Sequence, residues 1–217
     1  MAFKDNILTF EDDKIITDIG WSNIEVMMSW EAPIMEKSAE YICQSNGDVL
    51  EIGFGMGYSA TQIQKYTPKS HTIIECDFEV IKKCKEWAKN YNNVNIIEAK
   101  WQEVICTDKL KKYNEIFFDD FPNDMEEISE LQLFQSNQRI HLFIEFMKQY
   151  HMNPGSKISA YLCKNKTMFE DSLWKSKYID NPKWNYNEKI INTKVSNIQN
   201  YHKSNTKAII PLLTLGI

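Results

Sequence analysis

The sequence predicts a single α/β domain with a mostly parallel sheet and helices on both faces. Short apolar runs rich in β-branched residues alternate with segments of helical character, which is typical of strands joined by crossover helices. Three glycines also fall in one turn between such a run and a helix. The 217 residues suit one domain spanning 1–217. We expect residues 1–46 to form a mostly helical segment that covers the functional site of the domain.

Seven runs are expected to be strands, and they are Asp48–Phe54, His71–Asp77, Val94–Ala99, Glu115–Asp120, Lys157–Cys163, Glu188–Val195 and Ala208–Leu213. Helices are expected at Met35–Cys43, Ser59–Tyr66, Phe78–Asn90 and about Asp124–Tyr150, the last broken by Pro154-Gly155. Pro211 interrupts the last strand, and because proline cannot donate a ladder hydrogen bond we expect an edge or a bulge there.

Composition excludes several classes of protein. The net charge is −5 and the pI about 5.5, which disfavours a nucleic-acid binder, since such proteins carry basic surfaces. The five cysteines are widely spaced without a C-x-x-C pair, so neither a disulfide scaffold nor a zinc site is expected. The acidic N-terminus resembles no signal peptide and no apolar run is long enough to span a membrane, so we expect a cytoplasmic protein.

The segment Glu51–Gly57 (EIGFGMG) follows a predicted strand and opens a helix. Gly53 and Gly55 permit unusual dihedral angles and a close approach of the backbone to a ligand. The N–H groups at the start of the following helix suit an anionic group such as a carboxylate. This turn is therefore a candidate cofactor site, although an ordinary strand-to-helix turn has the same glycines.

An acidic residue ends the next predicted strand. Glu75 lies 22 residues after Gly53, where its carboxylate can accept hydrogen bonds from both hydroxyls of a ribose. The dinucleotide fingerprint G-x-G-x-x-G is incomplete, because Tyr58 stands where its third glycine belongs. A mononucleoside cofactor therefore fits better than NAD. After the third strand, Trp101 and Gln102 can hold an adenine ring, or Trp101 is a core residue at the rim.

Five stretches give the chain a specific resemblance to a known family. They read VMMSWEAP from Val26, VLEIGFGM from Val49, HTIIEC from His71, WQEV from Trp101 and FDDFP from Phe118. With them the chain, from about residue 24 to its end, resembles guanidinoacetate N-methyltransferases and the fungal protein arginine N-methyltransferases that modify the δ-nitrogen. The resemblance implies a Rossmann-like class I methyltransferase fold whose last strand is antiparallel, and S-adenosylmethionine as cofactor.

The resemblance also implies roles for individual residues. The cofactor site that it implies for this chain comprises Met27, Met35, Glu51, Gly53, Phe54, Gly55, Met56, Gly57, Tyr58, Ser59, Glu75, Cys76, Asp77, Trp101, Gln102 and Asp119. Glu31 and Asp119 are implied to hold the substrate and perform the chemistry, and Cys163 and Lys164 to contact the substrate. An aromatic residue of the N-terminal arm covers the cofactor in relatives, and Phe3 and Phe10 are the candidates. The chain departs from the family at Gly57-Tyr58 and in the loop after the fifth strand.

Two carboxylates suit chemistry on a guanidino group. A guanidinium has a pKa above 12 and is a poor nucleophile while protonated, so an enzyme gains by removing the proton as the new bond forms. We assign this chemistry to Asp119 with Glu31, and expect Asp120 to cap the next helix. Glu31 alone can also be read as an acid at a helix N-terminus ahead of Pro33. The four histidines form no spacing suited to a metal or a triad.

The leading hypothesis is a guanidino N-methyltransferase of a small, guanidinoacetate-like molecule, acting as a monomer or homodimer without nucleic acid or membrane. The close alternative is free or peptidyl arginine as acceptor. The sequence disfavours three other classes of protein. NAD-dependent oxidation is disfavoured by the missing third glycine, and nucleic-acid methylation by the acidity and the absence of an N/D-P-P-Y motif. A non-catalytic cofactor-binding subunit is disfavoured by the presence of both Glu31 and Asp119.

Overall fold

The computed structural model describes residues 8–19, 22–121, 138–162, 164, 166–193 and 207–216. Its centre is a seven-stranded sheet in the order β6-β5-β4-β7-β8-β10-β9. The strands are β4 (Asp48–Ile52), β5 (Ser70–Glu75), β6 (Val94–Glu98), β7 (Tyr113–Phe118), β8 (Met152–Ala160), β9 (Trp184–Asn192) and β10 (Lys207–Leu215). β10 is antiparallel to both of its neighbours and the other strand pairs of this sheet are parallel, which confirms the predicted fold class.

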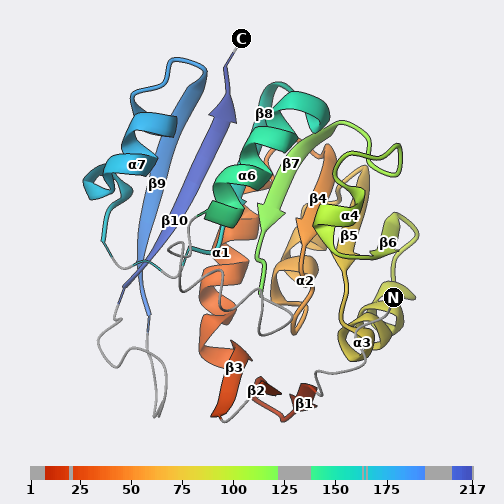
Figure 1. Cartoon of the computed structure of the whole chain (residues 1–217). Coiled ribbons are helices and arrows are strands. Elements are labelled where there is room, and N and C mark those ends of the chain that lie inside the picture. The colour runs from red at the N-terminus through yellow and green to blue at the C-terminus, as the bar shows by residue number, and fades with distance from the viewer. Residues whose placement is uncertain are drawn as a thin grey trace.

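Helices cover both faces of this sheet (Figure 1). One face carries α1 (Ala32–Ile42), α2 (Tyr58–Lys65) and α3 (Phe78–Ala88). The other carries α4 (Trp101–Val104), α6 (Gln138–Phe146) and α7 (Ser172–Trp174), with irregular turns at Met147–His151, Met168–Glu170 and Lys175–Ile179. No helix in the described ranges is long and apolar enough to cross a membrane.

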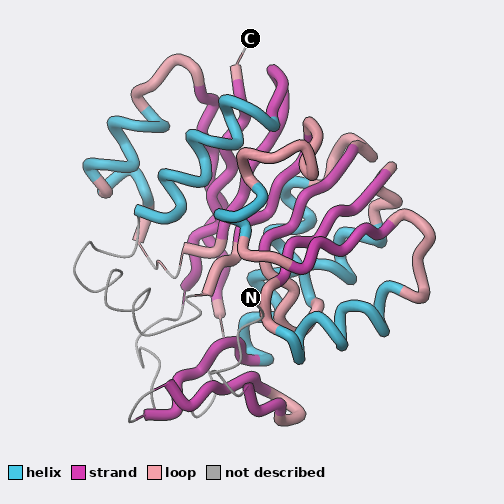
Figure 2. The backbone as a smooth tube through the Cα atoms, turned by 45° about the vertical axis from the view of Figure 1, so that its right-hand side comes forward, coloured by secondary structure: helices cyan, strands magenta, loops and turns pink. Residues whose placement is uncertain are grey.

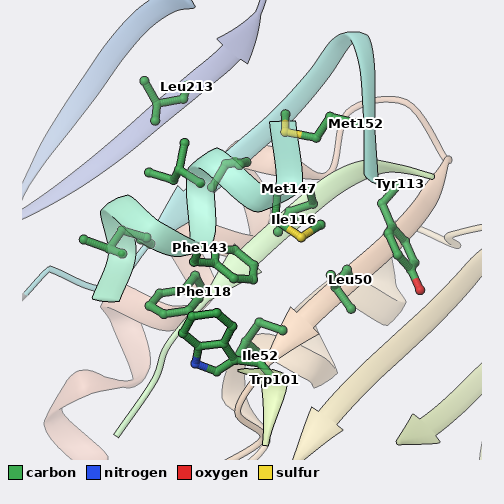
Figure 3. Packing of buried hydrophobic residues seen from close by; sticks show 14 of the residues in the cluster. Leu50, Ile52, Trp101, Tyr113, Ile116, Phe118, Phe143, Met147, Met152 and Leu213 are labelled. Atoms are coloured by element: carbon green, nitrogen blue, oxygen red, sulfur yellow. The ribbon is translucent and has the colours of Figure 1, made fainter. Parts of the chain in front are cut away.

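Alternate residues of the central strands feed two separate cores. On β4, Leu50 packs with α4 and α6, whereas Val49 packs with α1 and α2, and both are fully buried. Figure 3 shows the first core, in which Trp101, Phe118 and Phe143 meet under α6. Because both faces of a parallel sheet are covered, its strands read as near-continuous apolar runs, which is why they were recognisable in the sequence.

Between residues 8 and 28 the described part of the chain forms a small antiparallel sheet, so the prediction that residues 1–46 are mostly helical was wrong for these strands. The strands β1 (Leu8–Phe10), β2 (Lys14–Ile19) and β3 (Ser22–Met28) pair in that order and lead through a short 3₁₀ turn (Ser29–Glu31) into α1. On β2, Ile15 and Thr17 are buried on one face, a period of two that favours a strand. Figures 1 and 2 both place this sheet below the carboxyl ends of β4 and β7.

Two prolines lie inside strands. Pro211 belongs to β10, which lies between β8 and β9 rather than at an edge of the sheet. It pairs with Glu188 on β9, while the pairing of β10 with β8 is confined to Leu213 and Thr214. At Pro211 β10 therefore has a neighbour on one side only, which tolerates the missing N–H. Pro154 does not precede β8 as expected but lies within it, where the pairing with β7 shifts register.

Candidate active site

The glycine turn between β4 and α2 has the backbone conformation that the sequence predicted. Gly53, Gly55 and Gly57 have φ values of +81°, +54° and +75°, a region that L side chains rarely adopt. A Cβ atom at Gly53 would lie 2.2 Å from the carbonyl oxygen of Asp119. The absence of a side chain at Gly53 therefore allows the carboxyl end of β7 to approach the turn. Gly57 is the N-cap of α2, whose first amides face this edge of the sheet.

Met27 ties the N-terminal sheet to the glycine turn. Its Sδ atom accepts a hydrogen bond from the Met56 amide at 3.0 Å, and a Cβ atom at Gly55 would lie 2.4 Å from the same sulfur. β3 thus lies directly against the turn. Phe10 on β1 packs on the same side with the Lys83 ammonium 4.3 Å from its ring centre, whereas Phe3 lies outside the described residues.

Glu75 ends β5 beside this turn, as predicted. Its Oε2 accepts a hydrogen bond from the Phe54 amide at 2.9 Å, and its Oε1 accepts from the amides of Cys76 (2.7 Å) and Asp77 (2.9 Å). A carboxylate has about four acceptor positions, so this arrangement leaves room for roughly one further donor rather than two. Burial raises the pKa of Glu75, and the three amides oppose that rise.

Two residues of the predicted cofactor site, Glu51 and Ser59, contact each other beneath the turn. The Glu51 carboxylate is fully buried, accepts a hydrogen bond from the Ser59 hydroxyl and contacts His71 Nε2 at 2.8 Å. Gln64 Nε2 contacts the other ring nitrogen of His71 at 3.1 Å. This network joins β4, β5 and the first turn of α2. Its partners are far apart in sequence, so His71 had no recognisable local signal.

The structure gives the burial and contacts of four further residues of the predicted cofactor site. Trp101 is 4% exposed and packs edge-on against Phe118 and Phe143, so it presents little open face for an adenine ring. Met35 is buried in the core, and Gln102 is exposed. Asp77 caps α3, where its Oδ1 accepts hydrogen bonds from the amides of Glu79 and Val80 at 2.9 and 3.0 Å.

The thiol of Cys76 and the loop after β8 complete the predicted set. Cys76 is partly buried, and burial followed by the neighbouring Glu75 charge raises the pKa of its thiol. Cys163 lies outside the described residues. Lys164 is partly buried, and its carbonyl accepts a hydrogen bond from the amide of Ile209 on β10 at 3.0 Å.

Glu31 lies at the start of α1 and is 3% exposed. Its Oε2 accepts a hydrogen bond from the Met28 amide at 2.8 Å, and the hydroxyl of Tyr161 at the end of β8 donates a second. Burial raises the pKa of Glu31, while these two donors oppose the rise. Tyr161 was not predicted, because nothing in its local sequence distinguishes it from a core tyrosine.

Asp119 follows β7 at the carboxyl edge of the sheet. Burial raises the pKa of its carboxyl well above the ordinary value, and the next largest causes are the negative charges of Glu31 and Asp120. The charge of Glu31, 88 positions away in sequence, thus acts on Asp119. Within the described ranges, no group donates a hydrogen bond to the Asp119 carboxylate or forms an ion pair with it.

Asp120 differs from its neighbour in every contact. Its Oδ2 lies 2.6 Å from Nε and 2.6 Å from Nη2 of Arg139 on α6, and it accepts a hydrogen bond from Trp101 Nε1 at 3.0 Å. The expected role as a cap of the next helix is not tested, because residues 122–137 lie outside the described part. The structure therefore gives Asp120 a cationic partner within the protein, whereas Asp119 has none among the described residues.

The chain was compared with known proteins. Residues 9–209 match the family model for guanidinoacetate N-methyltransferase. Protein arginine N-methyltransferase 2 from Candida glabrata is 38% identical over 118 residues, which cover 52% of this chain and 27% of that protein. Its namesake from Aspergillus oryzae is 32% identical over 145 residues, which cover 64% of this chain and 33% of that protein. The matches thus span about a third or less of these relatives.

Solved structures share the fold at low sequence identity. An O-methyltransferase from Bacillus cereus in complex with SAH superposes with a TM-score of 0.61 at 11% identity, covering 84% of this chain and 80% of that one. An O-methyltransferase from Streptomyces achromogenes in complex with SAM gives a TM-score of 0.59 at 10% identity, covering 88% and 82%. The fold is therefore that of the class I methyltransferases.

Proposed function

Since the chain belongs to the guanidinoacetate N-methyltransferase family, we propose that it transfers a methyl group from S-adenosylmethionine to a guanidino nitrogen of a small, guanidinoacetate-like molecule. One observation carries the proposal. Asp119 lies against the glycine turn at the carboxyl edge of the sheet, the charge of Glu31 acts on it, and it has no cationic partner among the described residues. A planar cation is the ligand that such a pair favours.

The residues around the glycine turn fit S-adenosylmethionine. The positive φ values of the glycines open the turn to a ligand, the amides at the start of α2 suit its carboxylate, and Glu75 retains room for a ribose hydroxyl. Met27 and Tyr58 lie at the same turn. Met27 accepts a hydrogen bond from the Met56 amide, and Tyr58 is the first residue of α2 after Gly57. When bound, the cofactor supplies an electrophilic methyl group attached to a sulfonium.

The two carboxylates then act on the acceptor. Their mutual repulsion is relieved when a guanidinium binds between them, so substrate binding favours the ionised form of Asp119. Contacts from both carboxylates fix the plane of the guanidinium and aim one nitrogen at the methyl group. As the nitrogen–carbon bond forms, Asp119 accepts the proton that leaves this nitrogen, which avoids a free neutral guanidine. Glu31, held by Met28 and Tyr161, acts mainly on orientation.

A second acceptor is favoured by the comparisons. The curated relatives at 32–38% identity are named protein arginine N-methyltransferases, so arginine, free or in a peptide, is the alternative acceptor. The chemistry at Glu31 and Asp119 is the same for both acceptors. They differ in what surrounds the guanidino group, a carboxylate close by in guanidinoacetate and a longer chain in arginine.

A panel of acceptors tests the proposal. The protein is incubated with cofactor carrying a labelled methyl group and with guanidinoacetate, arginine, agmatine or an arginine-containing peptide, and products are identified by mass. We expect a gain of one methyl group on one of these compounds, with guanidinoacetate favoured over arginine. Transfer to the arginine peptide alone would move the assignment to the alternative. Cofactor binding without transfer to any guanidino compound would contradict the proposed function.

A further inference from the structure

Arg139 is the one arginine in a chain with 25 basic residues, and its side chain is partly buried. Its side chain is 18% exposed, and that of its partner Asp120 is 7% exposed. Both Nε and Nη2 approach the same carboxylate oxygen at 2.6 Å. A planar guanidinium with several fixed donors suits a partly buried ion pair better than a lysine does.

The pair connects three elements that border the acceptor site. Asp120 lies in the loop after β7, Arg139 in the first turn of α6, and Trp101 at the start of α4 donates its indole N–H to the same oxygen of Asp120. Trp101 in turn packs edge-on against Phe118 of β7 and Phe143 of α6, as Figure 3 shows. The loop that carries Asp119 is thereby fixed from two directions.

The surroundings of Asp119 explain why a cation is needed here. The charges that act most strongly on it all come from carboxylates, which are Glu31, Asp120, Glu51 and Glu75. Asp120 is the nearest of these in sequence and the one with a guanidinium bound to it. A buried carboxylate without such a partner is strongly destabilising. Two adjacent free carboxylates would also offer a cationic substrate two alternative registers.

We propose that Arg139 is a positioning residue for methyl transfer: by pairing with Asp120 it neutralises the carboxylate next to Asp119 and holds the loop, so that the acceptor meets Asp119 alone. This inference rests on the proposed function. It assigns the two adjacent aspartates different partners, an internal guanidinium for Asp120 and the substrate's guanidinium for Asp119. Arg139 touches neither cofactor nor substrate in this scheme and acts through Asp120.

The test uses charge substitutions on the full chain with the accepted substrate. Arg139→Met leaves the Asp120 carboxylate without its cation beside Asp119. The two aspartates then retain a proton to higher pH, so the acid limb of the kcat/KM profile moves to higher pH. We expect kcat/KM at pH 7 to fall on the order of 10–100-fold, as for a slightly misplaced reacting group. Arg139→Lys keeps the charge and the wild-type acid limb. Asp120→Asn combined with Arg139→Met removes the stranded charge and recovers most of the loss.

Lys111→Met is the matched control, because Lys111 pairs with Asp48 at 2.7 Å at the start of β4, and it should leave the profile unchanged. Should Arg139→Met fold poorly, Arg139→Lys and the double variant still supply the comparison. The inference is overturned if Arg139→Met keeps the wild-type profile, or if the double variant is no better than Arg139→Met. Failure of the proposed function looks different, because the wild-type protein would then methylate no guanidino compound at all.

Discussion

The cofactor edge and the acceptor edge of this site treat a buried carboxylate in opposite ways. Glu75, at the cofactor edge, accepts three backbone hydrogen bonds. Asp119, at the acceptor edge, receives none from the described residues and is surrounded by other carboxylates. Removal from solvent raises the pKa of both carboxyls, Glu75 being buried and Asp119 only partly exposed, but hydrogen-bond donors oppose the rise at Glu75 alone. Glu75 finds its partners within the protein, whereas Asp119 does not, and in the proposed function a cationic acceptor supplies the missing partner.

This difference has a physical meaning. A buried charge without a partner costs stability, and it persists where function uses the interaction that is missing. At the acceptor edge the missing partner is the guanidinium of the proposed substrate.

Asp119→Asn should have the largest effect, and in two opposite directions. Methyl transfer should fall about 10²–10⁴-fold, since an amide neither balances a cation nor accepts its proton. The fold should become more stable by roughly 0.5–2 kcal/mol, because an uncompensated charge is removed. Rates with the accepted substrate and denaturant unfolding at pH 7 measure the two quantities. Asp108→Asn, an exposed site with the same change of charge, is the control. Loss of both activity and stability would mean that Asp119 serves the fold.

Glu75→Ala tests the cofactor edge. Calorimetry with S-adenosylhomocysteine should show affinity weakened by roughly 1.5–3 kcal/mol, or about 10–150-fold, the range for charged hydrogen bonds. Glu98→Ala is a close control, because Glu98 occupies the position opposite Glu75 on the neighbouring strand β6 but is exposed to solvent. Melting midpoints of both variants separate loss of binding from loss of the turn. Tight binding of NAD with none of the nucleoside would overturn the cofactor assignment.

The pH dependence follows from the direction of the shifts. The pKa values of Glu31 and Asp119 are raised, so both carboxyls protonate at a higher pH than an ordinary carboxyl near 4. As pH falls through these values, kcat/KM should drop about tenfold per unit for each group that must be ionised. The stability advantage of Asp119→Asn should be present at neutral pH and vanish on acidification, because Asp119 is then neutral in the wild type as well. An advantage that persists at low pH would contradict the electrostatic explanation.

Asp77→Ala should have the smallest effect, and it distinguishes a helix-capping role of Asp77 from a cofactor-binding role. Its Oδ1 caps α3, so the variant should lose about 1 kcal/mol of stability. If this is its main role, the affinity for S-adenosylhomocysteine changes by less than about threefold, well below 1 kcal/mol. A tenfold loss of affinity at unchanged stability would instead support the cofactor role that the resemblance implies for Asp77.

Sequence alone predicted the features that depend on local patterns. Apolar runs located the strands of the large sheet, because both faces of that sheet are covered and each strand contributes apolar residues to the core. The glycine turn was recognisable since glycine tolerates the positive φ values found at Gly53, Gly55 and Gly57. The motifs around Glu31, Glu75 and Asp119 pointed to the family and to the chemistry. These signals come from neighbouring residues or from spacing along one chain segment.

Tertiary structure decided what each polar side chain actually contacts. Asp119 and Asp120 are adjacent and chemically identical, yet only packing against α6 brings Arg139 to one of them. The same holds for Glu51, which His71 and Ser59 enclose beneath the turn. The N-terminal strands were missed because they form a small sheet whose pattern covers few residues. Hydrogen-bond partners far apart in sequence leave no periodic trace, since their pairing is set by how whole elements pack.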